Sequence, residues 1–287
     1  MNKTQFIIKT EEIYNSFKDE IETIRHVGKI DVGPPNLKMV AVCAYAKCYD
    51  FVIYILSLDK LQNAFFQLPM LRGLCEDLIS ISYLLDLSPE ESNLILMSEQ
   101  LRKERDMIES QKEYFKKYNP GQIVVSKEIY PTIPEYKTLV GMDKEGERYL
   151  PKPIRMSKKV GLKDLYDFLY NATSKTVHFD VGTLLGMGWG NYDKTENKID
   201  INFSFKHNYH QYYDFVLFYS SLIFHKQTLR FKKAISSCDG ILNKLTPLIN
   251  DYEKIDWPTF ISFSQLNIKQ PSVFQRLTYR VMSKYRK

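Results

Sequence analysis

Two segments of this chain place ionisable residues at helical spacing among apolar ones. Arg72 and Glu76 are four residues apart in a leucine-rich stretch, and Ser174 and His178 are four residues apart much later in the chain. Residues at this spacing share one face of an α-helix. Histidine titrates near neutral pH and arginine binds phosphate, so the two pairs predict a polar site capable of acid–base chemistry on a phosphate-bearing substrate.

Each residue of this predicted site has an expected role. We expect His178 to be the general acid or base and Glu76 to orient its ring. Arg72 and Lys175 are the expected phosphate contacts, because charge-assisted hydrogen bonds to phosphate are strong. These four residues are compatible with acid–base chemistry on a phosphate or other oxyanion, and by themselves they do not name the reaction.

Ser174 and Asn171 extend the predicted site along the same helix. We expect Asn171 to contact the substrate, whereas Ser174 is a candidate nucleophile only if a base reaches its hydroxyl. The alternative interpretation is structural. The apolar neighbours of Arg72 and Glu76 indicate partial burial, and a buried ion pair needs further polar partners, which Ser174 and His178 would supply.

The Arg-x-x-x-Glu helix followed by the Ser-x-x-x-His helix resembles a bacterial family of all-helical proteins of unknown function, found among phage-defence and mobile-element genes, over about residues 40 to 230. More distantly, the segment before His178 resembles the HEPN class (higher eukaryote and prokaryote nucleotide-binding). In that class an arginine precedes a histidine by five to seven residues, and the pair cleaves RNA without a metal ion. Here positions 171 to 173 hold Asn, Ala and Thr. The resemblance therefore implies a nuclease only if Arg72 supplies the cation.

The sequence shows no complete metal-binding pattern. His207 and His210 are three apart, with Asp214 four residues further, but no other ligand accompanies them, so we interpret both as surface or partly buried histidines and not as metal ligands. We expect no metal and no cofactor. The four cysteines form no C-x-x-C pair and are predicted to be buried free thiols, as in a cytoplasmic protein. They are Cys43, Cys48, Cys75 and Cys238.

Hydrophobic periodicity predicts mainly α-helices, at about 10–25, 36–58, 69–85, 88–118, 207–234, 239–252 and 272–286, besides the helix before His178. Asn36 is a predicted N-cap, and Ser88 followed by Pro89 is typical of a helix start. The apolar stretch that ends at Leu58 contains charged residues and is predicted to be a core helix rather than a membrane span. The charged half-helix from Glu99 to Lys117 is predicted to be exposed to solvent or to flank a partner.

We therefore predict one mainly α, bundle-like domain over residues 1–287. It has a proline-rich irregular insertion at 119–162, at most a short β arm at 198–205, and a basic C-terminal tail at 257–287. That tail has six basic and no acidic residues, so the net charge of +6 arises there and residues 1–256 are neutral overall. Such asymmetry favours a local anionic partner.

The leading hypothesis is a cytoplasmic effector of bacterial defence, toxin-like, that acts on RNA or nucleotides with HEPN-like ribonuclease chemistry. One alternative is a non-catalytic helical sensor or scaffold that binds a regulatory protein partner through the polar network and the basic tail. Another is a membrane-surface effector whose C-terminal amphipathic helix lies on anionic lipid. Oligomerisation is compatible with all three hypotheses.

Overall fold

The computed structural model describes residues 3–26, 36–58, 64–118, 150–178, 180, 188–203, 209–235, 238–253 and 258–260, together with residues 272, 274, 275, 278 and 282. Most of the predicted insertion and of the basic C-terminal tail therefore lies outside the described residues. The described part is mainly α-helical, as predicted.

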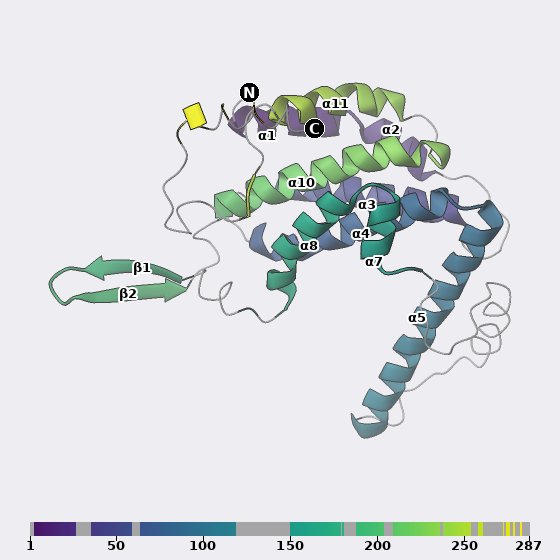
Figure 1. The fold of residues 1–287 in the computed structure, drawn as a ribbon, viewed down its shortest axis with the longest axis horizontal. Coiled ribbons are helices and arrows are strands. Elements are labelled where there is room, and N and C mark those ends of the chain that lie inside the picture. Colours follow the sequence, from purple (N-terminus) through teal and green to yellow (C-terminus); the bar gives the residue numbers. More distant parts are fainter. Residues whose placement is uncertain are drawn as a thin grey trace.

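Helix α10 (Tyr209–Arg230) is the centre of the body and packs against α3 (Leu37–Ser57) and α4 (Leu68–Leu85) (Figure 1). Every residue from Phe215 to His225 is buried. A helix that is buried on all its faces must be enclosed by other elements. The hydrophobic core therefore forms around α10.

Two groups of helices enclose this centre. The short helices α1 (Lys3–Asn15) and α2 (Lys18–Arg25) pack with α3, and α11 (Asp239–Glu253) packs against α1 and α10. On the other side, α7 (Pro153–Lys159) and α8 (Lys163–Val177) pack on α4 and on each other (Figure 1). One continuous hydrophobic cluster joins all these layers.

Local capping signals place several helix ends where they were predicted. The Asn36 side chain accepts a hydrogen bond from the Met39 N–H at 3.0 Å and begins α3. Ser88 begins α5 (Pro89–Tyr118) in the same way. The predicted helix at 10–25 is instead two helices. At the break, the Ser16 hydroxyl donates to the Ile13 carbonyl, a local bond that competes with helix continuation.

Helix α5 projects away from the body (Figure 1). Its predicted exposure holds for Met107 and Tyr114, which are 63% and 60% exposed. The prediction is wrong at Glu99, which is 5% exposed. Its carboxylate accepts hydrogen bonds from Arg102 at 2.9 Å and from the Leu150 N–H at 3.1 Å, and these donors offset the cost of burial.

A β-hairpin is the other projecting element (Figure 1). Strand β1 (Gly188–Asp193) pairs antiparallel with β2 (Lys198–Phe203), so the predicted short β arm is confirmed. At the end of the predicted insertion, α7 forms a regular helix where irregular chain was expected. A proline in its first turn is compatible with a helix, because an N–H there has no helical acceptor.

Helix α3 is the one helix in the described part that is long and apolar enough to cross a membrane. Half of its apolar window is buried inside the protein, where it packs on α10, which fits the prediction of a core helix. Three cysteines are buried as predicted, but Cys43 is exposed. It lies on the α3 face that also carries Lys47 and Asp50, and that face points to solvent.

A short 3₁₀ turn, η1 (Ala64–Gln67), precedes α4, and a second, η2 (Phe231–Lys233), follows α10. Both turns contact α10 or α4, and each contributes a buried phenylalanine to the core, Phe65 and Phe231 respectively. They close the two ends of the central helix layer.

Candidate functional site

Arg72 and Glu76 form the predicted ion pair on α4, with Arg72 Nε 3.0 Å from Glu76 Oε1. Their side chains are 28% and 33% exposed, so the pair is only partly buried. The residue of α8 that faces Arg72 is Tyr170, whose ring centroid lies 4.6 Å from the guanidinium carbon. This is a cation–π contact, and it occupies the position predicted for Ser174 and His178.

A pair of tyrosines on α8 forms this contact surface. The ring centroids of Tyr166 and Tyr170 are 5.5 Å apart. Burial raises the pKa of Tyr166, and the negative charge of Glu76 raises it further. Sequence reasoning missed this pair, although the two tyrosines have the same four-residue spacing as Arg72 and Glu76.

His178 lies one residue beyond the end of α8 as its C-cap, with extended backbone angles φ −104° and ψ 161°. Its N–H donates to the Ser174 carbonyl at 3.0 Å, and its side chain is exposed. The backbone leaves the helical conformation at this residue, so His178 lies at the end of α8 and not within the helix. Glu76 pairs with Arg72, so the expected Glu76–His178 contact is not among the hydrogen bonds of the described residues.

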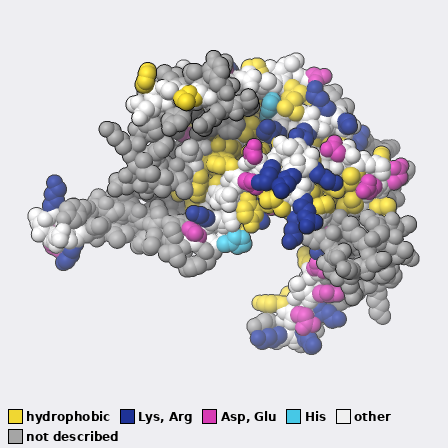
Figure 2. Space-filling view, viewed as in Figure 1, with side chains coloured by type: hydrophobic (Ala, Val, Ile, Leu, Met, Phe, Trp, Pro, Cys, Tyr) yellow, Lys and Arg dark blue, Asp and Glu magenta, His cyan; other side chains and the backbone are white. Residues whose placement is uncertain are grey.

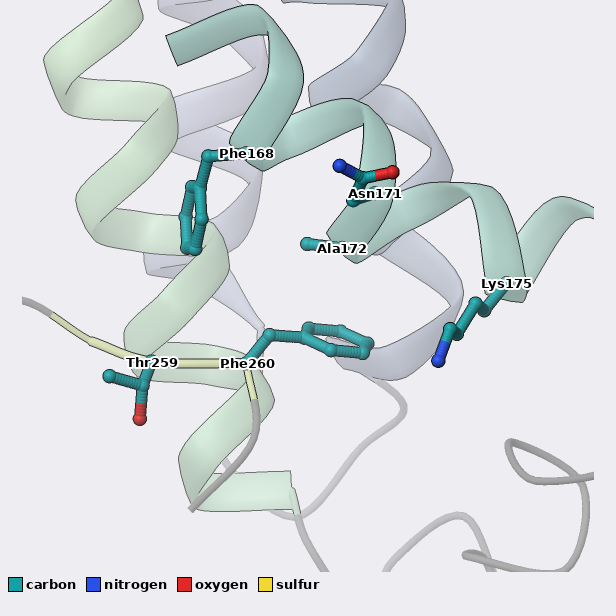
Figure 3. A pocket seen from close by; sticks show the side chains of 6 residues that line it. All are labelled: Phe168, Asn171, Ala172, Lys175, Thr259 and Phe260. Atoms are coloured by element: carbon teal, nitrogen blue, oxygen red, sulfur yellow. The ribbon is translucent and has the colours of Figure 1, made fainter. Parts of the chain in front are cut away.

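The two predicted substrate-binding residues do lie at a cavity. Asn171 and Lys175 line a cavity of about 380 Å³, together with Phe168, Ala172, Thr259 and Phe260 (Figure 3). The four α8 residues are three or four apart and share a helix face. Neither the Arg72–Glu76 pair nor His178 lines this cavity. The predicted site residues therefore lie in two places: the Arg72–Glu76 pair packs against one side of α8, and Asn171 and Lys175 line the cavity on another side.

The segment opposite α8 in the cavity is anchored to α10. The Tyr219 hydroxyl donates to the Pro258 carbonyl at 3.0 Å, and burial raises the pKa of Tyr219, so the donor stays protonated. Phe260 packs edge-on against Phe215, with ring centroids 5.5 Å apart. This wall was not predictable from local sequence, because residues 258–260 show no helical or strand pattern.

A second feature is a cationic surface on α7 and its N-cap residue, where basic side chains gather on the face shown in Figure 2. It consists of the exposed side chains of Lys152, Arg155, Lys158 and Lys159. Lys159 also lies over the Tyr83 ring of α4, at 5.2 Å from its centroid. Residues 150 to 163 contain no acidic residue. This local excess of basic residues is visible in the sequence, but the net charge summed over residues 1–256 is zero and does not reveal it.

The model of one protein family, described as a family of unknown function (DUF5677), matches residues 38–194. The chain belongs to this family. The DUF5677 match runs from α3 to the hairpin, so it includes the Arg72–Glu76 pair, the cationic surface and all of α8. It excludes α10, α11 and the segment with Thr259 and Phe260. No curated protein and no solved structure matches the chain.

Membership in DUF5677 confirms the predicted resemblance to a family of unknown function, and it assigns no activity. Among the described residues, no group of three or more His, Cys, Asp or Glu side chains could hold a metal ion. His207 lies outside the described residues, and the His210 side chain is not described, so that predicted pair stays untested.

Proposed function

We propose that this protein binds RNA through the phosphate backbone, using the cationic surface on α7. The observation that carries the proposal is the concentration of exposed positive charge on one short helix. Residues 150–178 contain six basic and two acidic residues, although residues 1–256 are neutral overall. Phosphate contacts by lysine and arginine provide most of the affinity of nucleic-acid binding that does not depend on sequence.

The charges of this surface are available to a ligand. Within the described part of the chain, Lys152, Arg155 and Lys158 form no ion pair. Elsewhere lysines are neutralised by carboxylates: Lys47 pairs with Asp77 on α4, and Lys163 pairs with its own helix neighbour. An RNA phosphate would therefore displace no ion-pair partner that belongs to the described residues.

The backbone beneath the cationic surface is held in place. Met156 and Ser157 are buried on the inner side of α7. At its end, the Leu162 N–H donates to the Ser157 carbonyl at 2.8 Å, and Arg230 of α10 donates to the Val160 carbonyl at 2.6 Å. The cations thus project from a fixed helix, which lowers the entropic cost of ordering them against RNA.

The test is a charge reversal, Arg155→Glu with Lys158→Glu, in the full chain. These residues are three apart on one helix face. Binding of a fluorescently labelled single-stranded RNA is measured by anisotropy over a range of KCl concentrations. We expect affinity to fall at least tenfold. The slope of log affinity against log salt should become shallower, by about 0.7 for each phosphate that the variant no longer neutralises.

The matched control reverses two exposed lysines of α5, Lys112→Glu with Lys116→Glu, which changes the net charge by the same amount. We expect this control to retain most of the wild-type affinity and its salt slope. Equal decreases in affinity in both double variants would show that only net charge matters and would refute the proposed surface.

A second candidate function is metal-independent RNA cleavage with His178 as general acid or base. Its support is the exposure of His178 at the end of α8, one turn beyond Ser174 and Lys175. The test is incubation of the same RNA in EDTA with wild type and His178→Ala. Cleavage by wild type alone supports the candidate, and cleavage by both or by neither rejects it. A role in phage defence, a regulatory protein partner or membrane contact through the tail has no described structural feature in support.

A further inference from the structure

We propose that the cavity between α8 and residues 258–260 is a binding site for a small, flat, amphipathic anion: an aromatic ring system that carries a carboxylate, sulfonate or phosphate group. The cavity measures about 380 Å³, within the range of small-molecule sites. It does not share a lining residue with the cationic surface, so this inference is independent of the proposed RNA binding.

The walls of the cavity are aromatic and are held by the core. Phe168 packs against Phe215 and Tyr219 of α10, with ring centroids 5.8 and 5.2 Å apart. Phe260 packs against Phe215 on the opposite side. Because both rings rest on the buried central helix, the cavity is formed before a ligand arrives.

The apolar surface of the cavity is partly open to solvent. Phe168 is 38% exposed, whereas the phenylalanines of α10 are fully buried. Ala172, itself buried, contributes only a methyl group and leaves room between the rings (Figure 3). A flat ring placed there would bury apolar surface and could stack or pack edge-on with Phe168 and Phe260.

The polar groups of the cavity favour an anion. Lys175 extends from the last turn of α8 toward the segment that carries Phe260 (Figure 3), and among the described residues it is the one charged side chain that lines the cavity. Among the described residues it has no ion-pair partner. Asn171, one turn earlier, offers an amide that can donate or accept hydrogen bonds. A ligand with its ring between the phenylalanines would thus place its acidic group at Lys175.

The experiment is a fluorescence titration of the full chain with 8-anilinonaphthalene-1-sulfonate, a flat aromatic anion whose emission rises in an apolar site. We expect saturable binding of one probe per chain. Lys175→Glu should weaken the affinity at least tenfold, because it replaces the cation with an anion. The affinity for the neutral probe N-phenyl-1-naphthylamine should fall less than threefold on the same substitution.

Two further variants locate the probe. Ala172→Leu should weaken the binding of both probes, because the larger side chain fills the space between the rings. The Arg155→Glu with Lys158→Glu variant removes charge only at the cationic surface and should leave both affinities unchanged.

The inference is overturned if Lys175→Glu binds the anionic probe as tightly as wild type, or if the charge reversal on α7 weakens that binding to the same extent. Near-UV circular dichroism checks that each variant is folded. Should Ala172→Leu fail that check, Lys175→Glu alone decides the outcome, since this residue is exposed and has no described partner. Loss of RNA binding by the α7 variant with retained probe binding would support both proposals separately.

Discussion

Glu76 and Glu99 each pair with an arginine of their own helix, but their surroundings differ. The side chain of Glu76 is 33% exposed and its partner Arg72 is 28% exposed. The side chains of Glu99 and Arg102 are 6% and 15% exposed, and Glu99 also holds the Leu150 N–H. Water can replace a missing partner at the first pair, but it cannot reach the second to the same extent. The two pairs should therefore differ in their contribution to stability.

We predict that Glu99→Ala lowers the free energy of unfolding by about 3 kcal/mol, because it leaves Arg102 and a backbone N–H without their acceptor. Glu76→Ala should cost at most about 1 kcal/mol, as is usual for a helix pair that water still reaches. Both substitutions introduce the same residue into a helix, so each controls for the other. Urea unfolding at pH 7, followed by circular dichroism, measures the difference, and equal decreases would contradict the prediction.

The pH dependence of the same pair supplies a second readout of this prediction. Burial alone would raise the pKa of Glu99, but the hydrogen bonds from Arg102 and Leu150 outweigh it and hold the pKa below the ordinary value of 4.5. A carboxylate whose pKa is lowered in the folded state stabilises the protein when the pH is above its ordinary pKa. This contribution is lost as the pH falls through the folded-state pKa. The stability difference between wild type and Glu99→Gln should therefore shrink as the pH falls from about 5 through the lowered folded-state pKa.

The connection between α7 and α8 depends on the conformation of Gly161. Its φ of +65° lies in the left-handed region. Gly161 and Leu162 donate hydrogen bonds to the Lys158 and Ser157 carbonyls, at 3.3 and 2.8 Å, and close the end of α7 in a Schellman motif. This turn sets the angle between α7, which carries the cationic surface, and α8. The turn thereby fixes where the cationic face of α7 lies relative to α8.

We predict that Gly161→Ala lowers the free energy of unfolding by about 1 to 2 kcal/mol, because a Cβ disfavours the left-handed conformation. Gly73→Ala is the matched control. Gly73 lies inside α4, and a Cβ there would meet no atom within 4 Å. This substitution should raise stability by about 0.5 to 1 kcal/mol. Thermal and urea unfolding of the two variants should thus shift in opposite directions, and shifts of the same sign would contradict the prediction.

The described helices share one core, and the DUF5677 match covers only part of it. Helix α10 lies outside residues 38–194, yet it packs against both α3 and α4 inside them. Tyr45 of α3, for example, is fully buried and contacts Phe224 of α10, with ring centroids 4.6 Å apart. Removing α10 would expose the inner faces of both helices to water. We therefore expect that the matched region does not fold without α10.

We predict that a fragment of residues 38–194 has helical circular dichroism but no cooperative thermal transition, because a large part of its core surface is uncovered. The full chain, prepared in parallel, is the control and should melt in a single transition. A sigmoidal melt of the fragment, with dispersed amide proton resonances, would show that the family region folds without α10.

Local features of the sequence were sufficient to predict most helices. The Asn36 and Ser88 side chains accept hydrogen bonds from N–H groups three residues away, so these caps can be predicted from a few neighbouring residues. The hairpin strand that begins at Lys198 was likewise predicted from alternation along a short segment. The break at Ser16 was not predicted, because the apolar stripe continues across it. The break coincides with a single hydrogen bond from the Ser16 hydroxyl, which the hydrophobic pattern does not indicate.

The helical class, most helix boundaries and the polar residues on α4 and α8 follow from local sequence. Which of these residues are in contact depends on how the helices pack. The packing of α8 on α4 sets Tyr170, and not His178, over Arg72. Thr259 and Phe260, far from α8 in the sequence, form the wall of the cavity that Lys175 also lines. Helix formation depends on neighbours three or four residues away, whereas these contacts join distant segments whose relative placement is set by burial of the whole core.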